Sequence, residues 1–542
     1  MAPSDDCGWL LYVSLAAKCG GEPYRVAGFV AVLLAACVVT ALLHWTSPGG
    51  AAWGRYRWTR RQALGIACIP GPRGLPVIGS MGLMTGLAHR KLAAAAGCGD
   101  GGRRRRLMAF SVGETRMVVT ADPDVARDLL ASPAFADRPV KESAYGLMFH
   151  RAIGFAPHGA YWRTLRRVAS SHLFSPRQVA SSAAQRAAIA CQMVDAMQAS
   201  VAVGVVVEAR RFVKRASLHN VMWSVFGRRY ELEAVSEEAA ELRSLVDEGY
   251  ALLGQLNWSD HLPWLAGFDL QRTRSRCSAL VPRVNRFVGR IIDEHRAVSD
   301  ADAVTDFTDV LLSLQGGDKL SDADMIAVLW EMIFRGTDTV AVVIEWVLAR
   351  MVMHQEVQAR VHEELDRVVG RRKAVTESDA ASLVYLQAVI KEVLRLHPPG
   401  PLLSWARLAT SDVHVGGFLV PAGTTAMVNM WAITHDPAVW SEPAEFRPDR
   451  FLAGPSRDHA AAEFSITGSD LRLAPFGSGR RSCPGKSLAI ATVGFWVATL
   501  LHEFEWMPPS SDGHGVDLSE VLGLSCEMAA PLEARLRPRR AV

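Results

Sequence analysis

The chain has 542 residues, 49% of them hydrophobic, and a formal net charge of +4 at pH 7. So small a charge excludes the strongly basic composition typical of nucleic-acid-binding proteins, and we expect no nucleic-acid partner. The nine cysteines are odd in number, lie far apart and form no Cys-x-x-Cys pair. This pattern favours neither a disulfide framework nor a zinc site, and it indicates a reducing compartment for the main part of the chain.

Near the N-terminus, Val26 to Leu43 form an uncharged and almost wholly apolar run of eighteen residues. At about 1.5 Å per residue, a helix of this length nearly crosses the hydrocarbon core of a membrane. Residues 26–43 are therefore predicted to be a transmembrane signal anchor, with residues 1–25 on the lumenal side. The aromatic and basic residues 53–61 that follow are typical of a cytoplasmic interface. A cleaved signal peptide is the alternative, but the run starts late and lacks a small-x-small cleavage site.

Residues 44–80 are predicted to connect this anchor to the rest of the chain. The stretch Ile69–Gly79 contains three prolines, which fix φ and bias the preceding residues away from helix. We expect a stiff, extended hinge here. No Ser/Gly-rich linker interrupts the sequence after about residue 80, so residues 81–542 are predicted to form one large domain.

Most of this domain has the periodicity of helices. The clearest pattern begins at Ser321, three residues before Asp324 as in a capping box, and runs through residues 325–353 without a proline. Further helices are predicted at residues 354–369 and 383–396, and short β-prone segments at residues 112–120 and 413–428. The predicted fold class is mainly α with a minor β region.

One cysteine stands in a setting suited to chemistry. Cys483 precedes residues 486–501, which are apolar and helical in pattern. Pro484 is predicted to occupy the first helical position, where its missing N–H costs nothing. The free N–H groups and the positive end of such a helix would stabilise a thiolate.

The neighbours of Cys483 support a metal-bound sulphur. Gly479 and Gly485 allow the backbone to approach closely, so that amide donors can shield the sulphur. Arg481 supplies a cation suited to a carboxylate group. The alternative is an inert, buried cysteine in a Gly-rich turn.

The whole loop Phe476–Gly485 resembles the haem-binding loop of the cytochrome P-450 family, Phe-x-x-Gly-x-Arg-x-Cys-x-Gly, at every fixed position. The resemblance implies the cytochrome P-450 fold, with haem b (iron protoporphyrin IX) between a long distal helix and the cysteine loop. It implies that Cys483 is the proximal iron ligand, and that the other fixed positions bind the cofactor: Phe476, Gly479, Arg481 and Gly485.

Glu392 and Arg395 match the Glu-x-x-Arg motif of the same family. Residues three apart on a helix share a face and can pair. The family adds a third partner from a later arginine, and Arg450 is placed to provide it. Alone, Glu-x-x-Arg usually marks a surface ion pair of little energetic value. Its position before Cys483 implies a structural role behind the haem.

Trp162 and Arg166 match the family's Trp-x-x-x-Arg motif. A spacing of four brings the indole N–H and the guanidinium together on one helical face, where both could donate to a haem propionate. Arg407 occupies a position where family members often provide another propionate contact. The alternative for Trp162 is a tryptophan that only packs in the core.

The long helix contains Gly336-Thr337-Asp338-Thr339, which resembles the family's proton-relay motif. Gly336 weakens a helix locally and Thr339 can bond back to a carbonyl, so the helix is expected to open here and admit water. Asp338 and Thr339 are the predicted catalytic relay for protons to iron-bound dioxygen.

Arg335 departs from the family pattern, which has Ala or Gly at this position. It lies four residues before Thr339, on the same helical face. Arg335 could pair with Glu331, four residues earlier, as an ordinary ion pair. Alternatively, it could point into the pocket and bind a substrate carboxylate or carbonyl. The first interpretation is slightly favoured.

Taken together, the motifs are similar to those of a plant microsomal subgroup of the family, associated with leaf initiation, organ or seed size and fatty-acid hydroxylation. The resemblance implies a monooxygenase of the endoplasmic reticulum membrane, single-pass, with its catalytic domain in the cytosol. Its partners would be an NADPH-cytochrome reductase, a flavoprotein that delivers electrons, membrane lipid, O₂ as co-substrate and a lipophilic small molecule.

Two other functions remain open from the sequence. A haem-thiolate isomerase or dehydratase would need no reductase, but it would also need no proton relay, which Asp338 and Thr339 provide. A non-catalytic haem-binding sensor or protein scaffold is disfavoured by the intact Cys483 and by the anchor.

Overall fold

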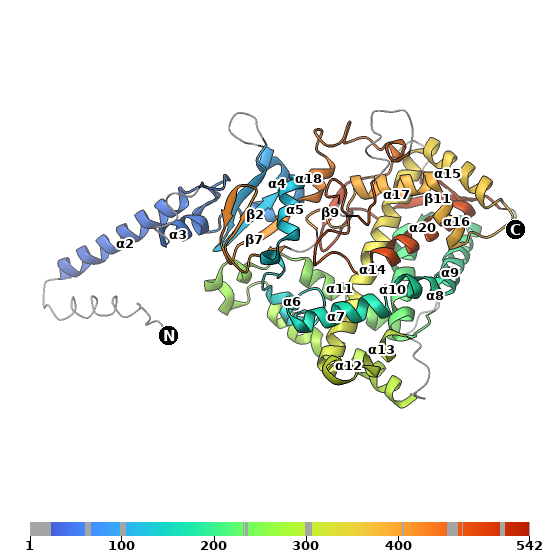
Figure 1. Ribbon diagram of the computed structural model, residues 1–542, viewed down its shortest axis with the longest axis horizontal. Coiled ribbons are helices and arrows are strands. Elements are labelled where there is room, and N and C mark those ends of the chain that lie inside the picture. Colours follow the sequence, from blue (N-terminus) through green and yellow to red (C-terminus); the bar gives the residue numbers. More distant parts are fainter. Residues whose placement is uncertain are drawn as a thin grey trace.

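The computed structural model describes residues 23–59, 67–97, 104–230, 232, 237–298, 306–403, 406–452, 464–468, 470–509 and 515–540. The N-terminal part of the predicted lumenal segment, residues 1–22, lies outside them. The fold is mainly α with a minor β part, as predicted (Figure 1). The helices before the long central one are α2 (Pro23–Trp45), α3 (Ala51–Thr59), α4 (Ala88–Gly97), α5 (Pro123–Ala131), α6 (Glu142–Gly146), α7 (Ala160–His172), α8 (Pro176–Ser181), α9 (Ala183–Ala202), α10 (Ala209–Phe226), α11 (Glu237–Gly254), α12 (Thr273–Val298) and α13 (Phe307–Ser313).

The remaining elements are the long helix, the helices that follow it and four small sheets. The helices are α14 (Asp322–Met353), α15 (Gln355–Val368), α16 (Glu377–Ser382), α17 (Val384–Leu396), α18 (Met430–Thr434) and α20 (Lys486–Glu503). The strands are β1 (Leu107–Val112), β2 (Thr115–Thr120), β3 (Val207–Glu208), β4 (Arg407–Leu408), β5 (Val413–Val415), β6 (Phe418–Val420), β7 (Thr425–Val428), β8 (Phe504–Met507), β9 (Glu520–Leu522), β10 (Cys526–Met528) and β11 (Glu533–Pro538).

Helix α14 runs through the body of the molecule (Figure 1). Its 32 residues begin after Ser321, whose Oγ accepts a hydrogen bond from the N–H of Asp324 at 3.2 Å, so the predicted N-terminal cap is confirmed. The N-terminal half of α14 packs in one hydrophobic cluster and the C-terminal half in another. A helix apolar on nearly all sides is stable only when it is surrounded by others, which explains its central place.

The largest sheet lies on the same side of the molecule as the N-terminal helices (Figure 1). Its strand order is β1-β2-β7-β4, and β2 and β7 pair in parallel, with Met117 opposite Thr425. Strand β4 pairs antiparallel with β7, which places Arg407 opposite Ala426. The predicted β-prone segments thus hold β2, β5, β6 and β7, but β1 begins five residues before the predicted start of the first segment.

Helix α2 projects from the body (Figure 1) and is longer at both ends than the predicted span of residues 26–43. It contains one stretch, Gly28–Trp45, that is long and apolar enough to cross a membrane, and none of this stretch is buried within the protein. No other described helix meets the same length and hydropathy criteria.

Residues 44–80, predicted to be a linker and a stiff hinge, are in part folded onto the body. Helix α3 buries Trp53, whose indole N–H donates to the carbonyl of Phe110 in β1 at 3.1 Å. Further along, the carbonyl of Pro70 accepts from the N–H of Ala109 at 2.9 Å. A Cβ on Gly71 would lie 1.7 Å from the carbonyl oxygen of Ala109, so only glycine allows this contact. The anchor is therefore attached to the sheet at two places.

Candidate active site

A cavity lies between α14 and the loop that carries Cys483. Thr339 and Arg335 of α14 line it, together with Phe476 and Cys483 of the loop. Much of the remaining lining is apolar, from α10, α14, α17 and α20: Val221, Val225, Met332, Val343, Leu394 and Leu488. The structure thus brings together the loop motif and the helix motif, although the sequence separates them by more than a hundred residues.

The backbone of the Cys483 loop folds back on itself. The N–H of Cys483 donates to the carbonyl of Phe476 at 2.9 Å. The prediction that Pro484 starts the helix is wrong, because α20 begins at Lys486 with Gly485 as its N-cap. The cysteine therefore precedes the first helical turn by one tight turn. Burial raises the pKa of its thiol, whereas a hydrogen bond from the backbone of Gly485 and the charges of nearby arginines oppose this rise.

Gly479 and Gly485 also approach the surrounding protein closely, in addition to the hydrogen bond that the backbone of Gly485 makes to Cys483. Gly479 has φ +70° and its missing Cβ would lie 2.0 Å from the carbonyl oxygen of Leu130. A Cβ on Gly485 would lie 3.1 Å from the ring of Phe174. Both close approaches are thus to the surrounding protein, and they fix the loop against α5 and the end of α7.

Four buried or half-buried arginines line one end of the cavity: Arg138, Arg166, Arg407 and Arg481. Burial, and then the charges of Arg481 and Arg166, lower the pKa of Arg407 to about 9. The nearby carboxylates are Glu331, on the cavity wall, and Asp137, 3.8 Å from Arg481. Positive charge therefore exceeds negative charge here. Two further carboxylates in the cavity would offset much of this excess, and haem carries two propionates, so these residues fit haem.

Trp162 is placed differently from the prediction. Its indole N–H donates to the carbonyl of Ile153 at 3.0 Å, and the side chain is buried. The guanidinium of Arg481 lies 4.4 Å from the centre of the indole ring and donates to the carbonyls of Ala136, Ile153 and Ala156. The indole donor is thus satisfied within the protein, and its ring supports Arg481 by a cation–π contact.

The donors of Arg166 divide between the protein and the cavity. Its Nη2 donates to the carbonyl of Ser482, next to Cys483, at 2.5 Å, and the side chain also lines the cavity. Arg407 reaches the same cavity from β4. These two arginines, with Arg138, are the best placed to meet a carboxylate of a bound group.

Glu392, Arg395 and Arg450 meet in a fully buried cluster. Arg395 donates from Nε and Nη2 to the two carboxylate oxygens of Glu392 at 2.7 and 2.8 Å, and Arg450 donates from Nε at 3.1 Å. The remaining donors of Arg395 reach the carbonyls of Thr434, Pro443 and Glu445. The cluster ties α17 to the segment before the cysteine loop, and it does not line the cavity.

Helix α14 does not open at Gly336, contrary to the expectation. The helix is continuous from Asp322 to Met353. A Cβ on Gly336 would lie 2.7 Å from Cγ2 of Val221, so the glycine allows α10 to pack closely against α14. The hydroxyl that bonds back to a carbonyl belongs to Thr337, which donates to Ile333 at 2.6 Å.

Thr339 and Asp338 point to different surroundings. Thr339 lines the cavity, whereas Asp338 is buried outside the cavity lining. One carboxylate oxygen of Asp338 lies 3.3 Å from Nζ of Lys214, which also lies 2.9 Å from the carboxylate of Glu527 in β10. The carboxylate is therefore held on the side of α14 that faces α10.

Arg335 both faces the cavity and pairs with Glu331. It lines the cavity, and its Nη1 lies 3.9 Å from Oε1 of Glu331. Glu331 is almost fully buried and accepts from the N–H of Gly154 at 2.8 Å. Burial raises the pKa of Glu331, and the charge of Arg335 opposes this rise. The pair forms a polar corner in a largely apolar cavity.

The sequence reasoning did not identify Arg138 or Lys214 and gave Glu331 only as a partner of Arg335. Neither Arg138 nor Lys214 lies in a recognisable motif, and each reaches its site only through tertiary packing. Glu331 sits four residues before Arg335 and eight before Thr339, so the helical period alone could have placed it on the cavity face.

Comparison with known proteins agrees with this geometry. The cytochrome P450 family model matches residues 69–525. The chain is 64% identical to cytochrome P450 78A9 of Arabidopsis thaliana over 93% of both chains, and 59% identical to cytochrome P450 78A3 of Glycine max over 99% of both. It is 33% identical to a flavonoid 3'-monooxygenase of Crocosmia x crocosmiiflora over 89% of this chain and 94% of the other. The chain belongs to the cytochrome P450 family and is a monooxygenase of that family.

Proposed function

We propose that the chain is a membrane-anchored monooxygenase that takes electrons from NADPH through a membrane-bound flavoprotein reductase and hydroxylates a lipophilic small molecule. The observation that carries the proposal is the single cavity that both Cys483 and Thr339 line. Members of the family use haem and dioxygen together with a redox partner. When bound, haem supplies the activation of dioxygen, and a thiolate ligand favours O–O cleavage.

Each group of cavity residues has a separate task in this proposal. Cys483 binds the iron as thiolate. Arg166, Arg407 and Arg138 neutralise the two propionates. Thr339 would hold a proton-donating water in the cavity, and the carboxylate of Asp338, turned away from Lys214, would relay protons from solvent to it. The buried cluster around Glu392 keeps the wall behind the cysteine loop rigid.

The cavity lining favours a lipophilic substrate with one polar group. Most of the wall is apolar, which excludes water and binds hydrocarbon. Arg335 of α14, which lines the cavity together with Glu331, is proposed to receive a carboxylate or carbonyl of the substrate. A fatty acid or a signal molecule derived from one has this combination. A role in plant growth or organ development rests on the sequence resemblance alone.

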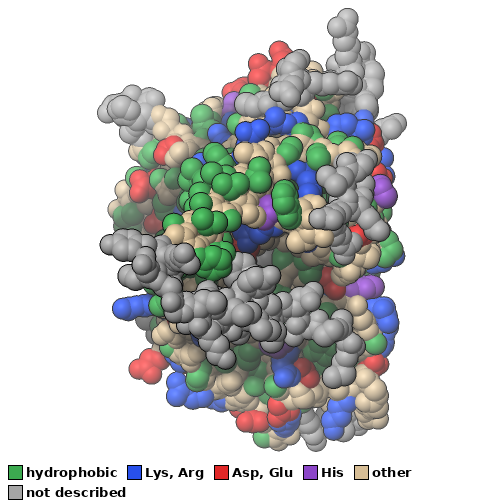
Figure 2. All heavy atoms as spheres, turned by 90° about the vertical axis from the view of Figure 1, so that its left-hand side faces the viewer, with side chains coloured by type: hydrophobic (Ala, Val, Ile, Leu, Met, Phe, Trp, Pro, Cys, Tyr) green, Lys and Arg blue, Asp and Glu red, His purple; other side chains and the backbone are tan. Residues whose placement is uncertain are grey.

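We further propose that the catalytic domain rests on the cytosolic face of the endoplasmic reticulum membrane. Figure 2 views the molecule from the side on which α2 projects, and hydrophobic side chains gather on this face. Apart from α2, exposed large apolar side chains occur in the hinge and in residues 263–270: Leu75, Val77, Trp264, Phe268 and Leu270. Exposed apolar groups beside a spanning helix suit contact with lipid.

The proposal is tested with the full-length chain in lipid vesicles, with and without a plant NADPH–cytochrome reductase. The probes are saturated fatty acids of increasing length and their methyl esters. We expect hydroxylated product that depends on both NADPH and reductase and that contains oxygen from isotopically labelled dioxygen. Turnover of a lipid hydroperoxide without NADPH or reductase, and no oxygen incorporation, would instead support the isomerase or dehydratase.

A further inference from the structure

The hairpin formed by β9 and β10 extends into the cavity. Leu524 and Ser525, which connect the two strands, both line it. On the far strand, the N–H of Cys526 donates at 2.9 Å to the carbonyl of Pro399, and Pro399 lines the same cavity. The position of this hairpin therefore sets part of the shape that a substrate meets.

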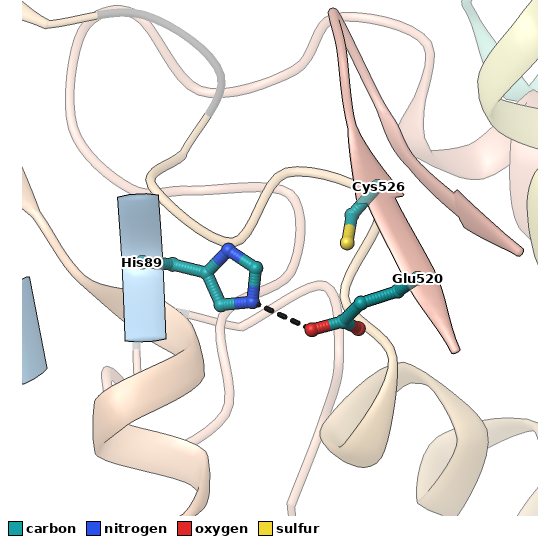
Figure 3. A group of neighbouring side chains, drawn as sticks. All are labelled: His89, Glu520 and Cys526. Carbon is teal, nitrogen blue, oxygen red and sulfur yellow. Dashed lines mark hydrogen bonds and ion pairs between the residues drawn. The ribbon is translucent and has the colours of Figure 1, made fainter. Parts of the chain in front are cut away.

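The base of the hairpin is held by a buried polar cluster on α4, as Figure 3 shows. The carboxylate of Glu520 lies 2.9 Å from Nε2 of His89 and accepts from Nε of Arg90 at 2.6 Å. The side chains of His89 and Glu520 are 0% and 3% exposed. His89 and Arg90 in turn lie against the ring of Trp431, at 5.3 and 5.2 Å between centres. Residues separated by more than four hundred positions thus fix one carboxylate.

The thiol of Cys526 points toward the same place (Figure 3). A nitrogen of His89, an oxygen of Glu520 and the sulphur of Cys526 lie within 4.8 Å of one another, as ligands of a metal ion would. The guanidinium of Arg90 argues against a metal, because it already bonds to the carboxylate. A guanidinium and a monovalent cation about 4 Å apart repel each other by about 4 kcal/mol at an effective dielectric constant of 20. For a divalent cation the repulsion is twice as large.

The charges make the contact between Glu520 and α4 strong. Burial would raise the pKa of the Glu520 carboxyl, but the hydrogen bonds and charges of His89 and Arg90 lower it to about 2. The carboxylate therefore remains ionised and bound throughout the physiological pH range. A charge-assisted contact in a buried site holds its partners more firmly than a neutral hydrogen bond does.

We propose that Glu520 is a positioning residue for substrate specificity: held by Arg90 and His89, it fixes the hairpin so that Leu524 and Ser525 limit the size and orientation of the bound substrate. This inference rests on the proposed function of the cavity. No substrate contact by Glu520 itself is involved, because it acts through the tip of the hairpin, four and five residues further along the chain.

The test compares the holoenzyme with its Glu520→Gln and Arg90→Met variants. Arg90 is half exposed, so we expect the Arg90→Met variant to fold even if the Glu520→Gln variant, which loses a buried carboxylate, does not. The probes are a small azole, 1-methylimidazole, and a long one, 1-dodecylimidazole, whose binding to the ferric protein is followed by absorbance. We expect the ratio of the two Kd values to change at least fivefold in both variants. The Kd ratio of the double variant is expected to change no more than that of the more affected single variant, because both substitutions break the same contact.

A second measurement does not require the haem. Hydrogen exchange of residues 515–528 is expected to be faster in both variants. Leu524→Ala, which trims the tip without loosening its base, is expected to change the Kd ratio while leaving the exchange unchanged. The control is Glu505→Gln. Like Glu520, Glu505 accepts a hydrogen bond from an arginine, here from Nε of Arg537 on the neighbouring strand at 2.7 Å, but it lines no part of the cavity.

The proposal is overturned if the Kd ratio and the hairpin exchange in Glu520→Gln and Arg90→Met match those of wild type, or change no more than in Glu505→Gln. Failure of the proposed function has a different signature. In that case wild type shows no reductase-dependent product or no azole spectrum, while hydrogen exchange still reports whether Glu520 and Arg90 hold the hairpin.

Discussion

The guanidinium of Arg335 and the carboxylate of Glu331 lie 3.9 Å apart, one helical turn from each other on the wall of the cavity. Arg335 is partly exposed and lines the cavity, and a guanidinium with five donors can bond to more than one acceptor. Both residues precede Thr339 on α14 and line the same cavity.

Arg335→Ala is expected to weaken the binding of a long-chain fatty acid by about tenfold or more, because a charge-assisted contact in an apolar cavity is lost. Binding of the methyl ester of the same acid is expected to change little. The measurement is the spectral Kd of both compounds for wild type and variant. Equal loss for acid and ester would assign Arg335 to its ion pair with Glu331 alone.

Glu392→Gln is expected to destabilise the protein by about 3–5 kcal/mol, because it leaves two buried guanidinium groups without their shared carboxylate. Arg395→Lys is also expected to be costly, since lysine cannot form the two parallel bonds to Glu392. Denaturant unfolding and haem retention measure both effects.

A matched control for the buried cluster is the exposed ion pair of Arg360 with Asp449, at 2.8 Å. Asp449→Asn is expected to cost less than about 1 kcal/mol. Similar losses in Glu392→Gln and Asp449→Asn would contradict the structural role of the cluster.

Gly336→Ala is expected to destabilise the protein by about 1–3 kcal/mol, although alanine is the better helix former. The reason is the added Cβ, which would lie 2.7 Å from Cγ2 of Val221, a stiff β-branched side chain. Combining it with Val221→Ala is expected to recover part of the loss. A stabilising Gly336→Ala would show instead that the glycine serves to loosen α14.

Asp338→Asn is expected to lower the rate of product formation by about a hundredfold while leaving substrate Kd unchanged, because it removes the proposed proton donor but not the cavity wall. The solvent isotope effect on turnover should increase. Asp322→Asn, at the exposed start of the same helix, is the control. An unchanged rate and isotope effect in Asp338→Asn would remove this residue from the relay.

Helices α14 and α17 were predictable because the apolar periodicity of each begins or ends at a clear signal in the sequence. The predicted start of α14 at Ser321 and the predicted end of α17 at residue 396 agree with the structure. The contact that was not predicted lies in the connector, where α3 packs through Trp53 on β1. Nothing local distinguishes a tryptophan that docks on a distant strand from one that lies at a membrane interface, so this contact required the tertiary structure.

For the site residues too, local patterns were predictable from the sequence and tertiary contacts were not. The resemblance to the family's motifs implied that Cys483, Thr339 and Arg166 surround one site, and all three line the same cavity. The partners of the side chains were less predictable. Trp162 donates to Ile153, nine residues earlier, and Asp338 pairs with Lys214 of α10. Neither contact follows from the helical period.

The most direct test of the central claim is the carbon-monoxide difference spectrum of the reduced protein, recorded for wild type and for Cys483→Ala. A strongly red-shifted Soret band in wild type alone is the predicted result, since only a thiolate ligand at Cys483 produces it. Circular dichroism of both proteins establishes that each is folded. A histidine-type band, or no haem in well-folded wild type, would contradict the assignment of Cys483 as the iron ligand and with it the proposed oxygen chemistry.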